Sequence, residues 1–572
     1  FYQSHYHPTN AIFMTFGDIP AAQHQAVFEE RALHHFTRQE LRIQVQPEQR
    51  LQAPVRVSGC YAYDESGPTD RKAHIVIGWL LGESVDLEQL LEAQLLSSVL
   101  LDNSASPLQQ ALETTKLGQS PSPLCGLEDG MREMVFCCGV EGGEAENAEA
   151  LEALVLGIIE RVATEGVSHD RMEAVLHQLE LHQREISGDG YPYGLQLILQ
   201  ALGCATHYSD PIAVLDLEPV IAGLRARIED PLYIRQLARR LLLDNPHRVT
   251  LVMTPDTGLS AQRNAAEADR LAAIKAAMGE QARADVVRLA EDLVRRQQRI
   301  DDADVLPRVE LCDVPASLPD LTYEQSSPQG IPLTTYGQGT NGLVYQQVVT
   351  SLPALEPAQL QVLPLYTHIL TELGLGASDY LEAQHRQSAT VGSLSAYSSM
   401  RGAVDDEQAV SARIVLSSKA LLRNAQAQAE LMRDTLENVR FDEYARMREL
   451  VSQQRARREQ SITGNGHGLA MAAACAGMSP LARLNHELSG LAGIRRLRAL
   501  DDSLQNEQLL AGFAAELGSL HQKVVAMPRQ LLVVAEDHRT AEVAAIAAQT
   551  WGGAPADGGA APLTLASCRE RR

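Results

Sequence analysis

The order of predicted elements repeats once along this 572-residue chain, and that duplication limits the fold more than any other feature. Residues of about 55–256 alternate strands with pairs of helices, and about 333–537 do so in the same order. We therefore expect an α+β protein with two similar domains, each a largely antiparallel or mixed sheet with helices on one face. Two motif pairs support the repeat, at offsets of about 276 and 281 residues: ISGDG (186–190) with ITGNG (462–466), and TLVMTPD (250–256) with QLLVVAED (530–537).

A region of different composition separates the two halves. Residues 261–300 are rich in Ala, Arg, Glu, Asp and Gln, carry apolar residues at heptad-like spacing, and are interrupted by Gly279. We interpret them as a hairpin of two charged helices that bridges the domains. Five regions are predicted: a short N-terminal region at 1–50 with a strand at 11–16 and a helix at 21–36, a domain at 51–257, the linker at 258–310, a second domain at 311–550, and a disordered or non-domain tail at 551–572.

Charge and hydropathy argue against two classes of partner. The formal net charge is −24, which repels phosphate backbones, so we expect no nucleic acid. No apolar run reaches the roughly 18 residues that span a bilayer, and no secretory signal opens the chain, so we expect no membrane partner. Since the chain begins with Phe1 rather than Met, we expect its true beginning, and any targeting segment, to lie upstream.

The cysteines indicate a reducing compartment. There are 8, scattered and without a CxxC pair, which favours reduced thiols and a cytoplasmic or organelle-matrix location. Cys137 and Cys138 are adjacent in an apolar, strand-like run. We expect at least one of them to pack in the core.

Three histidine-containing stretches are candidates for a metal site. His177 and His182 lie five residues apart, about 140° around a helix, whereas H-E-x-x-H and H-x-x-E-H place two imidazoles four residues apart on one face. The stretch at Asn485-His486-Glu487 lacks a second histidine, and His5 and His7, on one strand face, lack a third ligand nearby in sequence. We expect surface positions for these residues, and predict no catalytic, cofactor-binding or metal-binding residue in this chain.

The elements predicted around a glycine-rich stretch argue against a dinucleotide-binding site there. Residues 337–342 (GQGTNG) match GxGxxG, but a dinucleotide site needs a strand before the glycines and a helix after them. Here Leu343-Val344-Tyr345 is typical of a strand, and Asn341-Gly342 predicts a tight hairpin turn. The sequence contains no GxxxxGK[ST] loop and no G-x-S-x-G elbow.

Several stretches resemble presequence proteases, large zinc metalloendopeptidases of the pitrilysin (inverzincin) clan. The resemblance covers about residues 1–550, and it depends on the order and spacing of the stretches together. They are Tyr6–Ala11 with Phe16-Gly17-Asp18, Ser97–Leu101 with Ser106-Pro107-Leu108, Thr340–Tyr345, Leu373–Gly376 with Asp379-Tyr380, and Ile462–Gly468.

The resemblance implies four homologous pitrilysin-type α/β sandwich domains, arranged as two bowl-shaped halves around a closed chamber where unfolded or targeting peptides are cut. This chain then holds the end of the first, catalytic-type domain (1–50), the second and third domains, and the hairpin linker. The family's H-x-x-E-H motif and later Glu ligand lie upstream of the stretch matched by Tyr6, and its fourth-domain Arg and Tyr follow about Trp551. Zinc is thus implied for the full-length family, and none is predicted to be bound by this chain.

Three functions remain open. The chain is part of a zinc metalloendopeptidase, supplying a non-catalytic chamber wall and linker to the missing outer domains; or it is a non-catalytic binding or scaffold partner of a zinc-bearing homologous subunit; or it is an unrelated α+β binding protein. An H-x-x-E-H reading frame upstream favours the first. A start codon near Phe1 and a stop after Arg572 favour the second.

Overall fold

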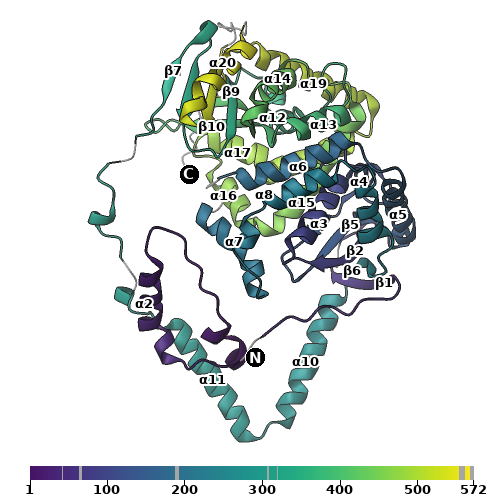
Figure 1. Ribbon diagram of the computed structural model, residues 1–572, viewed down its shortest axis with the longest axis vertical. Helices are drawn as coiled ribbons and strands as arrows, with labels where there is room; N and C mark the ends of the chain where they lie inside the picture. Colours follow the sequence, from purple (N-terminus) through teal and green to yellow (C-terminus); the bar gives the residue numbers. More distant parts are fainter. Residues whose placement is uncertain are drawn as a thin grey trace.

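The computed structural model describes residues 1–40, 43–63, 67–186, 192–305, 308–317, 320–552 and 561–566. Two helix-covered sheets form two units that lie against each other, and a pair of helices extends away from them (Figure 1). We call residues 55–256 unit one and residues 324–551 unit two. Residues 187–190 of the ISGDG motif, and 553–560 and 567–572 of the predicted tail, lie outside the described residues.

Unit one is built on a mixed sheet whose order is β1-β6-β2-β5-β3, with β4 also paired to β5. The first and last strands pair in parallel, with Val57 opposite Leu251, and the other neighbours are antiparallel. The chain therefore returns to its own beginning before it leaves the unit. The strands are β1 (Val55–Ala62), β2 (Ala73–Glu83), β3 (Ser120–Pro121), β4 (Gly126–Glu128), β5 (Glu133–Gly143) and β6 (Arg248–Asp256).

The helices of unit one begin and end where the sequence signals them. Asp86 accepts hydrogen bonds from the backbone N–H groups of Glu88 and Gln89 at the start of α3, and Gly166, at φ +79°, ends α5. In the core, the fully buried Trp79 donates to the Leu242 carbonyl at 3.0 Å. The helices are α3 (Leu87–Leu101), α4 (Pro107–Thr114), α5 (Ala148–Glu165), α6 (His169–Arg184), α7 (Tyr193–Thr206), α8 (Glu218–Arg227) and α9 (Tyr233–Ala238).

Unit two repeats the strand order of unit one. Its sheet runs β10-β11-β9-β12-β8-β7, and β12 is parallel to β8 and antiparallel to β9. Strands β8, β12, β9 and β11 thus take the places of β1, β6, β2 and β5, which confirms the predicted duplicated α+β class. The strands are β7 (Glu324–Ser326), β8 (Leu333–Gly337), β9 (Leu343–Ser351), β10 (Ser393–Gly402), β11 (Val410–Leu421) and β12 (Arg529–Ala535).

The predicted hairpin at Asn341-Gly342 is wrong in one respect. Both residues have positive φ, +52° and +79°, and the Leu343 N–H donates to the Thr340 carbonyl at 3.1 Å, so a tight turn is present. The strands on either side do not pair with each other, however, because β12 lies between them. A strand follows the glycines, as predicted.

Unit two carries more helices than its repeat partner, including a last one that we did not predict. Trp551, the first residue of the predicted tail at 551–572, ends α20, is 2% exposed, and lies under the Arg529 guanidinium at 5.3 Å. Leu563, inside that tail, also packs into the unit-two core. The helices are α12 (Pro357–Ile369), α13 (Tyr380–Thr390), α14 (Ala425–Glu437), α15 (Tyr444–Gly464), α16 (Gly466–Cys475), α17 (Pro480–Ser489), α18 (Leu491–Ser503), α19 (Glu507–Val525) and α20 (Thr540–Trp551).

Two linker helices, α10 (Leu259–Ala277) and α11 (Glu280–Gln298), meet at Met278-Gly279, as the composition predicts. They diverge as an open V that points away from both units (Figure 1). Neither helix contains a buried residue, and the heptad-like Leu271 and Leu289 are 51% and 69% exposed. The apolar spacing therefore marks a face that no described residue covers.

The N-terminal segment contains two helices, α1 (Tyr2–His5) and α2 (Ala21–Arg31), and no strand at 11–16, so that prediction is wrong. A strand needs a neighbour for its N–H and C=O groups, and no described strand pairs with this stretch. The segment touches unit one where Phe16 meets Tyr193 edge to face.

The described cysteines lie in different parts of the two units and of the segment between them. Seven cysteines are free, and Cys138 is fully buried in the unit-one core, which confirms that one of the adjacent pair packs there. Burial raises the pKa of its thiol well above the ordinary value, because the thiolate is poorly solvated there.

Candidate functional site

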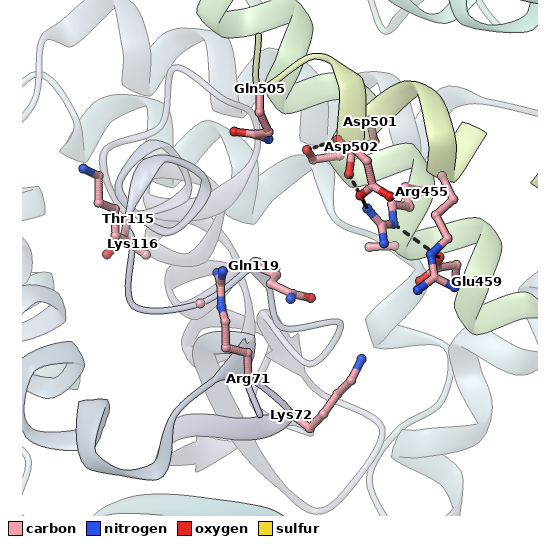
Figure 2. Close-up of a pocket in the computed structure, with 14 residues that line it drawn as sticks. Arg71, Lys72, Thr115, Lys116, Gln119, Arg455, Glu459, Asp501, Asp502 and Gln505 are labelled. Carbon is pink, nitrogen blue, oxygen red and sulfur yellow. Dashed lines mark hydrogen bonds and ion pairs between the residues drawn. The ribbon is translucent and has the colours of Figure 1, made fainter. Parts of the chain in front are cut away.

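A polar cleft of about 650 Å³ lies between unit one and unit two (Figure 2). Unit one contributes the residues before β2 and the loop after α4, and unit two contributes α15 and the end of α18. Because both units line it, the cleft depends on their relative position. The lining residues are Arg71, Lys72, Thr115, Lys116, Gly118, Gln119, Ser452, Arg455, Ala456, Glu459, Arg498, Asp501, Asp502 and Gln505.

An arginine-centred network organises the unit-two wall. Arg455 Nη1 donates to Asp501 Oδ2 at 2.8 Å and to Asp502 Oδ1 at 2.7 Å, and its Nε donates to Glu459 Oε1 at 3.2 Å. Ser452 Oγ donates to the other Asp501 oxygen at 2.5 Å. Although burial opposes it, these carboxylates raise the pKa of Arg455, so three carboxyl groups hold one fixed cation.

The unit-one wall is basic. Arg71, Lys72 and Lys116 line the cleft, and the structure gives their side chains no carboxylate partner within the part of the chain it describes (Figure 2). Arg71 holds a left-handed backbone, φ +54°, and its N–H donates to Glu144 Oε1 at 2.8 Å. Within the described residues, three cations without a carboxylate partner thus line the wall across the cleft from the unit-two carboxylates.

These walls are suited to binding. Opposite charges across a polar gap attract ligands that carry charges of both signs, and the gap's polar groups can satisfy a peptide backbone. The lining residues include no histidine or cysteine, and Ser452, which donates to Asp501, has no imidazole to accept its proton. Among the lining residues, no nucleophile is therefore paired with a base.

Helix packing between α6 and α13 sets the distance between the two walls. Gln178 on α6 donates to the carbonyls of Ser388 and Val391 at 2.6 and 2.7 Å. Lys419 Nζ contacts both Glu185 oxygens at 2.6 Å. The contacts are polar, as is common where two parts of one chain meet.

Glu180 is the centre of this interface. Its carboxylate, 10% exposed, accepts from Arg423 of unit two at 2.9 and 3.2 Å, and from Arg184 and Arg225 of unit one at 3.1 and 3.2 Å. The hydrogen bonds from Arg423 lower the pKa of Glu180 to about 2, against the opposing effect of burial. The carboxylate is therefore ionised throughout the neutral range.

The structure separates the two predicted helix histidines. His177 is 6% exposed and lies at the unit interface, with its Nδ1 3.5 Å from Arg423 Nη2 and its Nε2 3.4 Å from Asn424 Nδ2, so the predicted surface position is wrong for it. His182 is exposed, as predicted. Desolvation, and then the charge of Arg423, lowers the pKa of His177, which keeps the ring neutral.

The other predicted histidines have local roles. Neither His5 nor His7 lies on a strand: His5 ends α1 and its ring stacks on Phe1, and His7 caps the 3₁₀ helix Pro8–Asn10, where its Nδ1 accepts from the Thr9 N–H at 3.2 Å. His486 lies in the last turn of α17.

Among the described residues, one group with metal-ligand spacing escaped the sequence analysis. His169, Glu173 and Glu229 place their ligand atoms within 4.8 Å of one another. The His-x₃-Glu spacing at the start of α6 is the sequence signal that could have indicated this group. The group lacks a second imidazole, and Arg225 already lies 3.9 Å from Glu173. This donor set does not fit a catalytic zinc of the H-x-x-E-H type.

The sequence analysis also missed the residues that line the cleft, although those of unit two are regularly spaced along the sequence. Positions 452, 455, 456 and 459 on α15, and 498, 501, 502 and 505 on and after α18, follow the i, i+3, i+4, i+7 spacing of one helix face. Sequence alone gives two polar stripes without showing that they share one cleft.

Two family models match the chain. One, described as "Peptidase M16 inactive domain", matches residues 1–179, and the other, for the associated region of M16 peptidases of subfamily C, matches residues 253–500. The mitochondrial presequence protease of Xenopus tropicalis is 28% identical over 506 residues, 87% of this chain and 49% of that protein. Presequence protease 1, chloroplastic/mitochondrial, of Arabidopsis thaliana is 27% identical over 537 residues, 92% of this chain and 49% of that protein.

The chain therefore spans about half the length of the curated relatives it matches. The crystal structure of pitrilysin is 10% identical with a TM-score of 0.41, over 88% of this chain and 48% of that one. None of the described helices has both the length and the apolarity to cross a membrane.

Proposed function

We propose that this chain, which two M16 peptidase family models match and which is similar to the middle portion of presequence proteases, forms a non-catalytic wall of a peptide-degrading chamber. The observation that supports this most is the charged cleft between the units, which can bind a chain segment and lacks a nucleophile–base pair. The match to a model named for the family's inactive domain agrees with it.

The ligand that we propose is an unfolded peptide. The cleft presents side chains of both signs, which suits a segment with mixed charges. Relatives named as mitochondrial or chloroplastic presequence proteases support the targeting peptides that their name denotes, and an organelle matrix or the cytoplasm as the location.

Catalysis would require partners. The described donor groups do not fit the family's zinc, so we propose that the metal and its general base come from the half of the relatives that this chain does not match, or from a homologous subunit. In the second arrangement this chain is a natural non-catalytic partner.

Peptide binding tests the wall function. We expect a fluorescently labelled, unstructured peptide with mixed charges to bind the purified chain. The double substitution Lys72→Glu and Lys116→Glu reverses two charges of the basic wall, which would contact the acidic residues of the peptide. It should raise the Kd for the peptide by about 10-fold, since each rim charge contributes up to about 1 kcal/mol. Lys275→Glu on exposed α10 is the matched control and should bind like wild type. Equal affinity in all variants contradicts the role of the cleft.

Activity tests whether catalysis needs a zinc-bearing partner. We expect no peptide cleavage by the chain alone, and cleavage when the zinc-bearing portion of a presequence protease is supplied in trans. Metal analysis should find no stoichiometric zinc in the purified chain. One tightly held zinc, lost on replacing His177 and His182, contradicts the helix-geometry argument.

A further inference from the structure

A second charged cluster crosses the interface at Arg446 on α15. The Arg446 side chain is 2% exposed, and its Nη2 donates to Ser104 Oγ of unit one at 2.8 Å and to Glu372 Oε2 at 3.0 Å. Its Nη1 lies 3.2 Å from Glu113 Oε2 of unit one and 3.2 Å from Glu449 Oε2 of unit two. One guanidinium therefore joins carboxylates from both sides.

The charges in this cluster do not balance. Three carboxylates surround a single cation, and those of Glu113 and Glu449 are 7% and 16% exposed, so water can screen them little. The Oε2 atoms of Glu113 and Glu449 each lie 3.2 Å from the same Arg446 Nη1, so the two carboxyl groups converge across the interface. Two buried like charges that converge in this way repel each other, which favours a proton on one of them.

The other charged or titratable groups near the pair are His368, Tyr380, Arg446, Arg457 and Glu372. Burial, and then the charge of Arg457, lowers the pKa of His368 to about 4, so its ring is neutral near pH 7. Burial raises the pKa of Tyr380, whose ring lies 4.8 Å from the Arg446 guanidinium. Arg446 and Arg457 stay charged, and burial raises the pKa of Glu372 as well.

We propose that a proton shared by Glu113 and Glu449 holds the two units together, and that its loss above neutral pH loosens their interface and opens the charged cleft. The device is regulatory and does not depend on what the cleft binds. Gln109, which donates to Glu113 Oε1 at 2.8 Å, and Gln384, which donates to Glu372 Oε2 at 3.3 Å, hold the carboxylates in place in either state.

The sign follows from proton linkage. Burial first, and the Glu113 carboxyl among the further causes, raises the pKa of Glu449 to about 7 in the closed interface, from an ordinary 4.5. A raised pKa means that the closed state holds a proton that the open state releases, so closure is favoured at acid pH and is lost as pH rises through about 7. A difference of this size changes the closing equilibrium by up to about 10²-fold between pH 4.5 and pH 8.

Hydrogen exchange of the intact chain, measured at pH 6 and pH 8.5 with labelling times matched for intrinsic rates, tests the proposal. Wild-type peptides from α4, α6, α13 and α15 should lose protection at the higher pH, while core strand β2 should not. Glu449→Gln removes the titrating carboxyl group and should lose most of this pH dependence. Glu113→Gln leaves Glu449 able to titrate but removes its like-charged neighbour, so it should reduce the pH dependence. Glu382→Gln, exposed on α13, should behave like wild type.

Two results would overturn the proposal. One is wild-type protection of the interface helices that does not change between the two pH values. The other is a pH dependence in the Gln variants equal to that of wild type. The two variants lie in opposite units, so if one fails to fold the other decides, and if neither folds the wild-type comparison with Glu382→Gln decides.

Discussion

Glu180→Gln should weaken the contact between the units at neutral pH and have little effect in acid. The substitution keeps the size of the side chain and removes the negative charge that three arginines share, one of them, Arg423, in the other unit. Above pH 4.5 the wild-type carboxylate is ionised in both folded and unfolded chains, and the folded chain gains its ion pairs. As pH falls towards about 2, the unfolded chain takes up the proton first and this gain is lost.

The magnitude follows from the depth of that shift. A fall in pKa from 4.5 to about 2 corresponds to about 3 kcal/mol at about 1.4 kcal/mol per unit. The side chains of Arg184, Arg225 and Arg423 are 32%, 40% and 55% exposed, so water screens part of the interaction. We therefore expect Glu180→Gln to cost about 2 kcal/mol at pH 7.

Tryptophan fluorescence can report on each unit separately. The chain has 2 tryptophans, Trp79 in the core of unit one and Trp551 in the core of unit two. Urea titrations of Trp79→Phe and Trp551→Phe backgrounds therefore follow one unit at a time, which avoids treating the whole chain as two-state. Glu180→Gln should lower the midpoint of both reporters at pH 7, and the difference from wild type should shrink between pH 4.5 and pH 3.

The matched control is Glu160→Gln, an exposed residue of α5. It should change the free energy of unfolding reported by either tryptophan by no more than about 0.5 kcal/mol. The reasoning is refuted if Glu180→Gln costs as much at pH 3 as at pH 7, or no more than Glu160→Gln at either pH.

Three further outcomes are expected. Gly139→Ala should destabilise unit one by about 3 kcal/mol, because a Cβ there would lie 2.1 Å from the Ile75 carbonyl oxygen. Gly203→Ala on α7 places its Cβ in open space and should be neutral or slightly stabilising, and urea titration compares the two variants. Asp86→Ala should cost about 1 kcal/mol through loss of the α3 cap, measured in the same way. The purified chain should bind a hydrophobic dye and self-associate in light scattering, and Leu199→Gln, which removes a half-exposed leucine, should reduce both; a monomer without dye binding contradicts this.

Local signals predicted most of the elements. The Asp86 cap, the Gly166 stop and the Gly279 break depend on backbone groups within a few residues, so they can be read without knowing the fold. The duplication was readable for a related reason, since similar segments in the same order are expected to form the same sheet. The predicted boundaries of the five regions remain predictions.

Contacts over long separations were beyond these signals. Periodicity shows that one face of α6 is covered and does not show by what, so the surface position predicted for His177 is wrong because unit two buries it. For the same reason the order of β8, β12 and β9 could not be predicted. The turn at Asn341-Gly342 does not show that β12, from the end of the unit, lies between the two strands that the turn connects.

The sequence by itself determined the α+β class, the repeat, the charged linker and the absence of an H-x-x-E-H pair in this chain. Only the tertiary structure decided where function can lie. The charged cleft, the Glu180 centre and the Arg446 cluster each combine side chains from both units, as with Glu180 and Arg423, which are 243 positions apart. Charges on a helix surface look alike in sequence whether they face water or another unit, and only burial beside a specific partner changes their pKa and gives them a role.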